Sequence, residues 1–139
     1  MGEGGDCLEG LRGGLERLAR SISDLGLHSL VVFGSRARGD CLRDSDIDVL
    51  VVAEGFEGRP FYEREYLVLE RYRGGLPVEP WCYTPKEVLD ALEGRPRLDV
   101  LDALEYGVVI VDDGFWERAR RLYNARRPRR TPYGGVALG

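Results

Sequence analysis

The chain has 139 residues, of which 43% are hydrophobic, and a formal net charge of −4 at pH 7. This length suits one domain with a single core, and the lack of any apolar run of about 18 residues excludes a membrane-spanning helix. The acidic balance argues against binding to a nucleic-acid backbone. Three cysteines without metal-type spacing and a single histidine argue against a disulfide framework, a zinc site and histidine-based catalysis. The N-terminus lacks the features of a signal peptide, so we expect a cytoplasmic protein.

The first predicted element is an amphipathic helix. Leucine and isoleucine recur at spacings of three and four over residues 8–25, and Gly26 is expected to end the helix. A short apolar run, 29–33, predicts a buried strand that Gly34 ends. After a polar segment that could begin with a short helix, residues 46–52 predict a second strand.

The second half of the chain continues the alternation of helices and strands. Two prolines in the third predicted strand indicate an edge position, and Thr84-Pro-Lys-Glu87 has the pattern of a capping box at a helix start. We expect a helix over 61–72, a strand over 76–83, helices from Thr84 to about 93 and over 98–106, a strand over 107–111 and a helix over 115–125. The order predicts an α/β (α+β) fold, a small mixed sheet flanked by helices, in one domain over 1–126. Residues 127–139, rich in Arg, Pro and Gly, are expected to be a flexible tail.

Gly34 and Ser35 form the first candidate site. A glycine turn after a strand presents free backbone N–H groups to an anion, and the following helix start adds positive potential. The serine hydroxyl and the Arg36 guanidinium could provide further donors to phosphate. Without other evidence, an ordinary turn is the better explanation of Gly-Ser.

Asp46 and Asp48 form the second candidate site. Side chains two apart on a strand point to the same face, and two neighbouring carboxylates are costly to bury without a cation. Oxygen-only ligands suit Mg²⁺ held partly by substrate phosphates. The alternative is a solvated acidic loop edge, since Asp40 and Asp44 precede the pair.

The spacing of the two sites carries a resemblance to a known family. Gly34-Ser35, ten residues and then Asp46-Ile-Asp48 resemble the signature of the DNA polymerase β-like nucleotidyltransferase superfamily, especially its minimal nucleotidyltransferase (MNT) domains. The resemblance implies a polymerase β-like nucleotidyltransferase fold. It also implies an enzyme that transfers a nucleoside monophosphate, with AMP from ATP as the expected case.

The resemblance further implies a third carboxylate on an adjacent strand, for which Glu79 is the candidate. One glutamate in a short strand could also be an ordinary surface residue, and Glu87 is better explained by its capping role. The family pattern implies that Asp46, Asp48 and Glu79 bind two Mg²⁺ ions. It also implies that Glu79 accepts the acceptor's proton, while Gly34, Ser35 and Arg36 hold the triphosphate.

The acceptor is not specified by these motifs. MNT domains of this size resemble antitoxins that pair with HEPN-domain ribonuclease toxins, which implies AMP transfer onto a toxin tyrosine and a hetero-oligomer. Two alternatives stay open: a stand-alone adenylyltransferase acting on a small molecule or nucleic acid, and a non-catalytic partner-binding module. The arginine-rich tail could be a solvated end, a docking arm for an acidic partner or, less consistent with the overall acidity, an RNA-binding segment.

Overall fold

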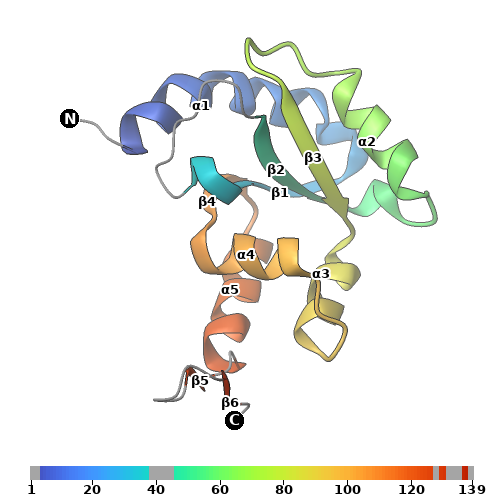
Figure 1. Cartoon of the computed structure of the whole chain (residues 1–139). Helices are drawn as coiled ribbons and strands as arrows, with labels where there is room; N and C mark the ends of the chain where they lie inside the picture. The colour runs from blue at the N-terminus through green and yellow to red at the C-terminus, as the bar shows by residue number, and fades with distance from the viewer. Residues whose placement is uncertain (1–3, 38–45, 127–128, 131–135, 138–139) are drawn as a thin grey trace.

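The computed structural model of the chain places helices on both faces of a four-stranded sheet (Figure 1). It describes residues 4–37, 46–126, 129–130 and 136–137. The sheet has the order β3-β2-β1-β4; β1 runs antiparallel to β2 and β4, and β2 runs parallel to β3. Its strands are β1 (Leu27–Phe33), β2 (Ile47–Ala53), β3 (Val78–Tyr83) and β4 (Val108–Asp112). This mixed sheet with flanking helices confirms the predicted fold class.

The two faces of the sheet are covered by different helices. On one face pack α1 (Gly4–Ser21) and α2 (Phe61–Leu69), and on the other pack α3 (Pro85–Leu92), α4 (Leu98–Tyr106) and α5 (Phe115–Arg126) (Figure 1). The central strands β1 and β2 are therefore buried on both faces, which explains their continuous apolar runs. Alternate residues enter the two cores: Leu30, Val32, Val49 and Val51 pack towards α1, and Val31, Leu50 and Val52 pack towards α3–α5.

Two helices end earlier than their apolar periodicity predicts. The helix α1 stops at Ser21, and a 3₁₀ turn, η1 (Ser23–Leu25), replaces its expected last turn before Gly26 adopts a φ of 73°. The helix α2 stops at Leu69, and in the segment that follows the Tyr72 hydroxyl donates a hydrogen bond to the Leu76 carbonyl. A further 3₁₀ turn, η3 (Glu54–Phe56), follows β2 directly.

The predicted capping box at the start of α3 is present. The Thr84 hydroxyl accepts a hydrogen bond from the Glu87 backbone N–H at 3.2 Å, and the Glu87 carboxylate accepts one from the Thr84 N–H at 2.9 Å. Glu87 also forms an ion pair of 2.7 Å with the buried Arg64 of α2, whose Nη1 donates to the Cys82 carbonyl at 3.0 Å. Arg64 thus ties α2, β3 and α3 together, and β3 lies at the edge of the sheet as its prolines indicated.

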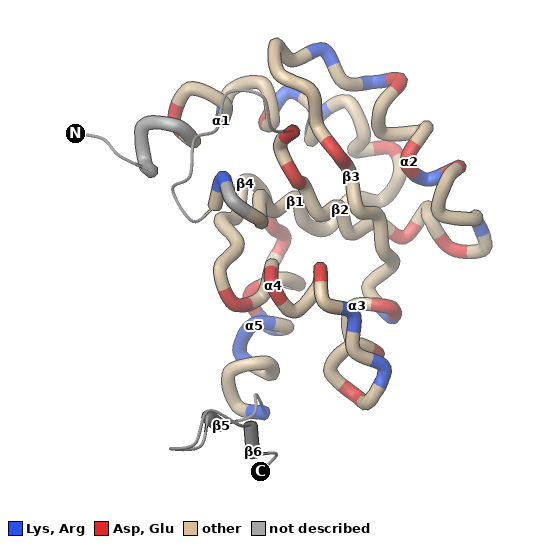
Figure 2. The backbone as a smooth tube through the Cα atoms, in the orientation of Figure 1, with Lys and Arg blue, Asp and Glu red and all other residues tan. Residues whose placement is uncertain are grey.

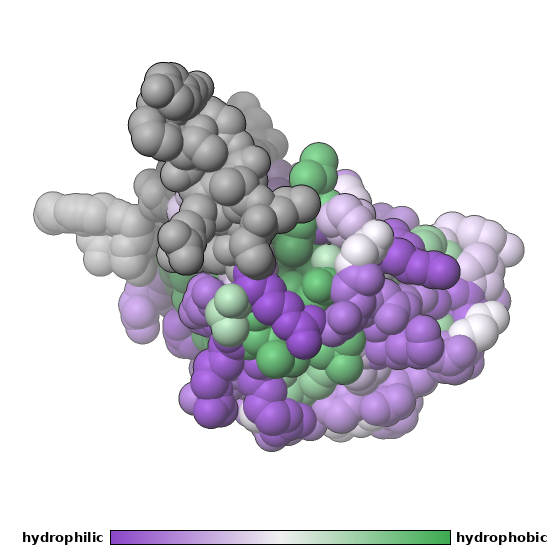
Figure 3. Space-filling view, turned by 90° about the horizontal axis from the view of Figure 1, so that it is seen from below, coloured by the Kyte–Doolittle hydropathy of each residue, from purple (hydrophilic) through white to green (hydrophobic). Residues whose placement is uncertain are grey.

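The C-terminal region beyond α5 is described only in part. Arg129–Arg130 (β5) pair antiparallel with Val136–Ala137 (β6), and the other residues of 127–139 lie outside the described part of the chain, as does Cys41. The boundary at 126 and the flexible tail therefore stay predictions. No described helix is long and apolar enough to cross a membrane. Seen from below, the surface is mostly hydrophilic with a small apolar group at its middle (Figure 3).

Candidate active site

The register between β2 and β3 places two of the predicted acidic residues beside each other. Asp48 is the direct partner of Glu79 in the parallel pair, and on its other side it pairs with Phe33 at the end of β1. Asp46 is exposed and lies just before β2, on the same face as Asp48 because side chains alternate along an extended chain. Figure 2 shows the acidic residues of β2 and β3 next to each other at one end of the sheet.

The charges of these carboxylates interact. Burial raises the pKa of Asp48, and the nearby Asp46 and Asp102 carboxylates raise it further, against the effect of the Trp81 and Glu79 side chains. Burial and then the proximity of Asp48 raise the pKa of Glu79. Both shifts have the sign expected when like charges share a partly buried site.

This group of oxygens fits a hard divalent cation in its chemistry. It contains only carboxylate oxygens, and a cation at the same place would compensate the neighbouring negative charges, which after burial are a further cause of the two raised pKa values. Among the side chains that the structure describes, no three His, Cys, Asp or Glu residues are arranged closely enough to hold a metal ion. Coordination of Mg²⁺ by Asp46, Asp48 and Glu79 therefore stays a prediction.

Gly34 is the point at which β1 meets the carboxylates. It has a φ of +75°, in the left-handed region, and a Cβ built on it would lie 2.5 Å from Asp48 Oδ2. The absence of a side chain at this position therefore lets the Asp48 carboxylate sit directly against the turn. The turn continues as the short 3₁₀ helix η2 (Gly34–Arg36), which contacts β2, α1 and α4.

The predicted phosphate-binding turn consists of Gly34, Ser35 and Arg36, and the structure describes the side-chain surroundings of only part of it. The Gly34 N–H, which we expected to face phosphate, donates a hydrogen bond of 3.2 Å to Asp102 Oδ2 on α4. Arg36 is buried, with 5% of its surface exposed, although we expected its guanidinium beside an open phosphate site. The Ser35 side chain lies outside the described residues. The phosphate-binding roles of Gly34, Ser35 and Arg36 stay predictions.

Asp102 and Trp81 also lie at this site, but neither is part of a motif from which the site was predicted. Asp102 touches the turn at Gly34 N and contributes to the electrostatics of Asp48. Trp81 Nε1 forms no hydrogen bond of normal geometry within the described residues, yet it faces Asp48 closely enough to favour the charged carboxylate. Trp81 follows Glu79 by two positions, so strand alternation could have placed it on the same face. Nothing local could have placed Asp102, because its position depends on how α4 packs.

A family model described as "Nucleotidyltransferase domain" matches residues 15–127, which include every described element from β1 to α5. The chain belongs to the nucleotidyltransferase domain family. It is therefore a nucleotidyltransferase, as its Gly-Ser and Asp-x-Asp motifs predicted, and the acidic residues around Asp48 lie within the matched region.

A relative with a known name matches about three quarters of the chain. The nucleotidyltransferase chain is 32% identical over 107 residues to a protein of Methanocaldococcus jannaschii named "Putative protein adenylyltransferase MJ1305", covering 74% of this chain and 71% of the relative.

One solved structure shares the fold, and a second is more distantly similar. A crystal structure titled as that of a "putative nucleotidyltransferase" from Sulfolobus solfataricus has a TM-score of 0.50 and 24% identity, covering 81% of this chain and 91% of the other. A structure titled as a toxin-antitoxin with AMP-PNP has a TM-score of 0.47 and 16% identity, covering 82% and 87%. The second likeness is too distant to bear on what this nucleotidyltransferase binds.

Proposed function

We propose that this nucleotidyltransferase transfers AMP from ATP, in the presence of Mg²⁺, to a hydroxyl group of a partner protein, with a tyrosine of a HEPN-type ribonuclease toxin as the acceptor. The observation that carries the proposal is the pairing of Asp48 with Glu79 directly beside the Gly34 turn. A protein acceptor is supported by the name of the relative from M. jannaschii, a protein adenylyltransferase. The tyrosine and the toxin partner are supported by the resemblance of the motif to MNT antitoxins.

In this proposal the acidic residues bind the metal and the Gly34 turn binds the triphosphate. Asp46, Asp48 and Glu79 hold the metal, which supplies charge compensation for the triphosphate and for the developing charge at the α-phosphorus. The turn at Gly34, whose own N–H is held by Asp102, places the backbone and hydroxyl donors of Ser35 against the β- and γ-phosphates and so fixes the leaving group.

The chemical step is a displacement at phosphorus. The acceptor oxygen forms a bond to the α-phosphorus, the bond from that phosphorus to the bridging oxygen breaks, and pyrophosphate leaves with the bonding electrons. The hydroxyl proton passes to the Glu79 carboxylate, which lies beside Asp48 on the neighbouring strand.

The test is label transfer from ATP labelled at the α-phosphate. The full chain is incubated with labelled ATP, Mg²⁺ and a candidate toxin protein, and the double variant Asp46→Asn with Asp48→Asn is compared with Asp90→Asn, a matched change on the exposed face of α3. We expect label on the toxin with the wild type and with Asp90→Asn, and none with the double variant although its fold is intact by circular dichroism. Undiminished transfer by the double variant would refute the assignment. Label on a small molecule or nucleic acid instead of protein would favour the stand-alone adenylyltransferase.

A further inference from the structure

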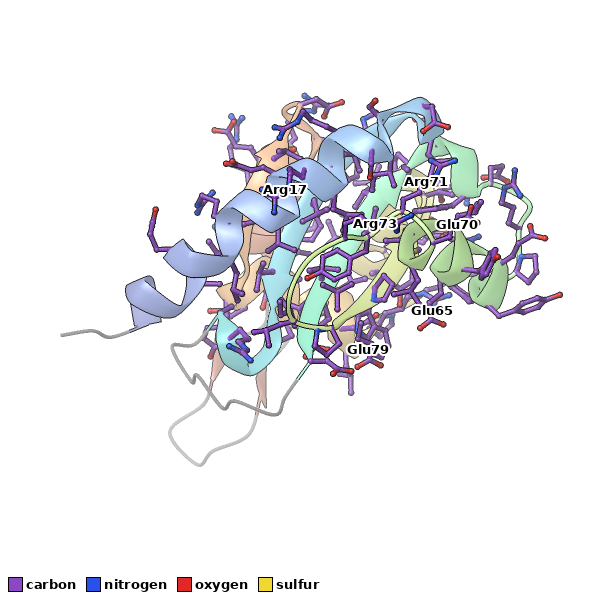
Figure 4. The ribbon with its side chains drawn as sticks, turned by 90° about the horizontal axis from the view of Figure 1, so that it is seen from above. Arg17, Glu65, Glu70, Arg71, Arg73 and Glu79 are labelled. Atoms are coloured by element: carbon purple, nitrogen blue, oxygen red, sulfur yellow. The ribbon has the colours of Figure 1, made fainter. Side chains whose placement is uncertain are left out.

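A pocket of about 320 Å³ opens beside Glu79, on the outer side of the edge strand β3. The strand contributes residues 79–83, α2 contributes Phe61 and Glu65, and the residue before α4, Arg97, closes the other side. Figure 4 shows Glu65 and Glu79 projecting from α2 and β3 at the same side of the molecule. The pocket therefore touches the candidate active site through Glu79 but extends away from the Gly34 turn.

The lining of the pocket is suited to an aromatic ring. Phe61 and Tyr83 meet edge to face with centroids 5.6 Å apart, and the Arg97 guanidinium lies 5.3 Å from the Phe61 centroid and 5.2 Å from that of Tyr83. Trp81 also lines the pocket. Aromatic and guanidinium surfaces favour a further aromatic ring, and the Glu79 carboxylate can accept a hydrogen bond from a hydroxyl.

The backbone of β3 is poorly suited to pairing with an added strand. The Pro77 carbonyl accepts a hydrogen bond from the Ile47 N–H at β2, so by alternation the Cys82 carbonyl points away from β2, where it accepts the bond from Arg64 Nη1. By alternation the backbone of Pro80 points the same way, and proline has no N–H to donate. With one carbonyl occupied and one N–H missing, this edge disfavours strand addition. The pocket is thus shaped for a side chain rather than for an extended peptide.

The position of the pocket matches the direction of attack in the proposed reaction. In an in-line displacement the attacking oxygen approaches the phosphorus opposite the leaving group. The proposed triphosphate turn follows β1, on one side of β2, whereas β3 and the pocket lie on the other side. Resting on the proposed function, we infer that the pocket lined by Phe61, Trp81, Tyr83 and Arg97 binds the tyrosine ring of the acceptor protein and directs its hydroxyl to Glu79.

An exposed apolar stripe on α2 extends the pocket into a protein-binding surface. Tyr62, Tyr66 and Leu69 follow one another at helical spacing and expose 76%, 64% and 41% of their surface. Large apolar side chains gathered next to a site indicate contact with a protein rather than with a small molecule. Phe61, which lines the pocket, precedes the stripe on the same helix and is itself 47% exposed.

Binding of the ring is tested independently of catalysis. The full chain, labelled with ¹⁵N, is titrated with N-acetyl-L-tyrosinamide without ATP, and amide chemical shifts are followed. We expect saturable changes, with a dissociation constant on the order of 1 mM, at residues 61, 65, 79, 81–83 and 97. Changes centred on residues 34–36, or no saturation at ten times that concentration, would overturn the inference.

Variants of Phe61 test the ring contact. Phe61→Ala is expected to weaken binding of N-acetyl-L-tyrosinamide about fivefold, as expected for the loss of an aromatic contact. Phe61→Tyr keeps a ring in the same place and should restore binding, which a general loss of folding could not explain. Tyr66→Ala, on the outer stripe of the same helix, should leave binding of the small probe unchanged. Equal binding by wild type and Phe61→Ala contradicts the inference.

The two proposals fail in different ways. Asp46→Asn with Asp48→Asn should abolish AMP transfer but leave the chemical-shift changes caused by N-acetyl-L-tyrosinamide unchanged. If the wild type binds N-acetyl-L-tyrosinamide but neither it nor any variant transfers AMP, the proposed reaction is refuted and the assignment of the pocket is retained. With transfer present, Phe61→Ala should raise the KM for the tyrosine acceptor and leave the KM for ATP unchanged. An equal rise in both KM values would place the pocket on the ATP side and overturn its assignment to the acceptor.

Discussion

The contact between Gly34 and Asp48 gives the sharpest test of the candidate site. Substitution of Gly34 by alanine has two costs that can be separated. The left-handed φ of +75° is unfavourable for any residue with a Cβ, by about 1–2 kcal/mol of folding free energy. In addition, the new Cβ would lie 2.5 Å from Asp48 Oδ2, whereas Cβ atoms essentially never approach another atom more closely than 3.0 Å.

The second cost falls on activity rather than on stability. The clashing atom is the end of a side chain, so the Asp48 carboxylate can retreat, by at least the 0.5 Å that separates 2.5 Å from 3.0 Å. Because a misplacement of about 1 Å in a reacting group can reduce a rate about 100-fold, we expect Gly34→Ala to lower kcat for AMP transfer about 10- to 100-fold.

Gly58 supplies a matched control for this substitution. Its φ of +77° is nearly the same as that of Gly34, but a Cβ built on it meets nothing within 4 Å. Urea denaturation should therefore show similar losses of stability, about 1–2 kcal/mol, for Gly34→Ala and Gly58→Ala. Transfer of labelled AMP should fall only for Gly34→Ala. Full activity in Gly34→Ala, or an equal loss of activity in both variants, would refute the reasoning.

Three further predictions follow from other contacts. Arg64→Ala leaves Glu87 without its ion pair and should lower the free energy of unfolding, measured by urea denaturation, by about 2–4 kcal/mol. Lys86→Ala, which removes an exposed ion pair, should lower it by less than about 0.5 kcal/mol. Similar losses in the two variants would contradict the structural role of Arg64. Asp102→Ala should reduce AMP transfer, because it removes the acceptor for the Gly34 N–H. Asp102→Asn keeps an acceptor oxygen and should recover part of the transfer activity. Identical activities of the two variants would exclude a role of Asp102 in positioning the Gly34 turn. Burial lowers the pKa of His28, but its hydrogen bonds to two carboxylates raise it more, so the net shift is upwards. The stability that charged His28 contributes is therefore present below its unfolded pKa and lost as pH rises through its folded pKa. The difference in free energy of unfolding between wild type and His28→Gln should shrink over that rise in pH. A difference that grows with pH would contradict the upward shift of the His28 pKa.

Features that depend on near neighbours in the chain could be predicted from the sequence. The capping box of Thr84 and Glu87, the end of β1 at Gly34 and the edge position of the proline-containing strand all arise from local backbone geometry, and the structure contains each of them. The motif that joins Gly34 to Asp48 was sufficient to predict the nucleotidyltransferase family, because its spacing spans only two adjacent strands.

Contacts between distant segments were decided by the tertiary structure. The parallel register between β2 and β3 pairs Asp48 with Glu79, and no local pattern specifies such a register, since several offsets bury the same apolar residues. The packing of α4 brings Asp102 to the Gly34 turn from 68 positions along the chain, and the approach of α2 to β3 forms the pocket beside Glu79. Sequence alone therefore determined which residues are acidic, capped or conformationally free. Packing decided which of them meet, because the free energy that selects a register or a helix position is summed over the whole core.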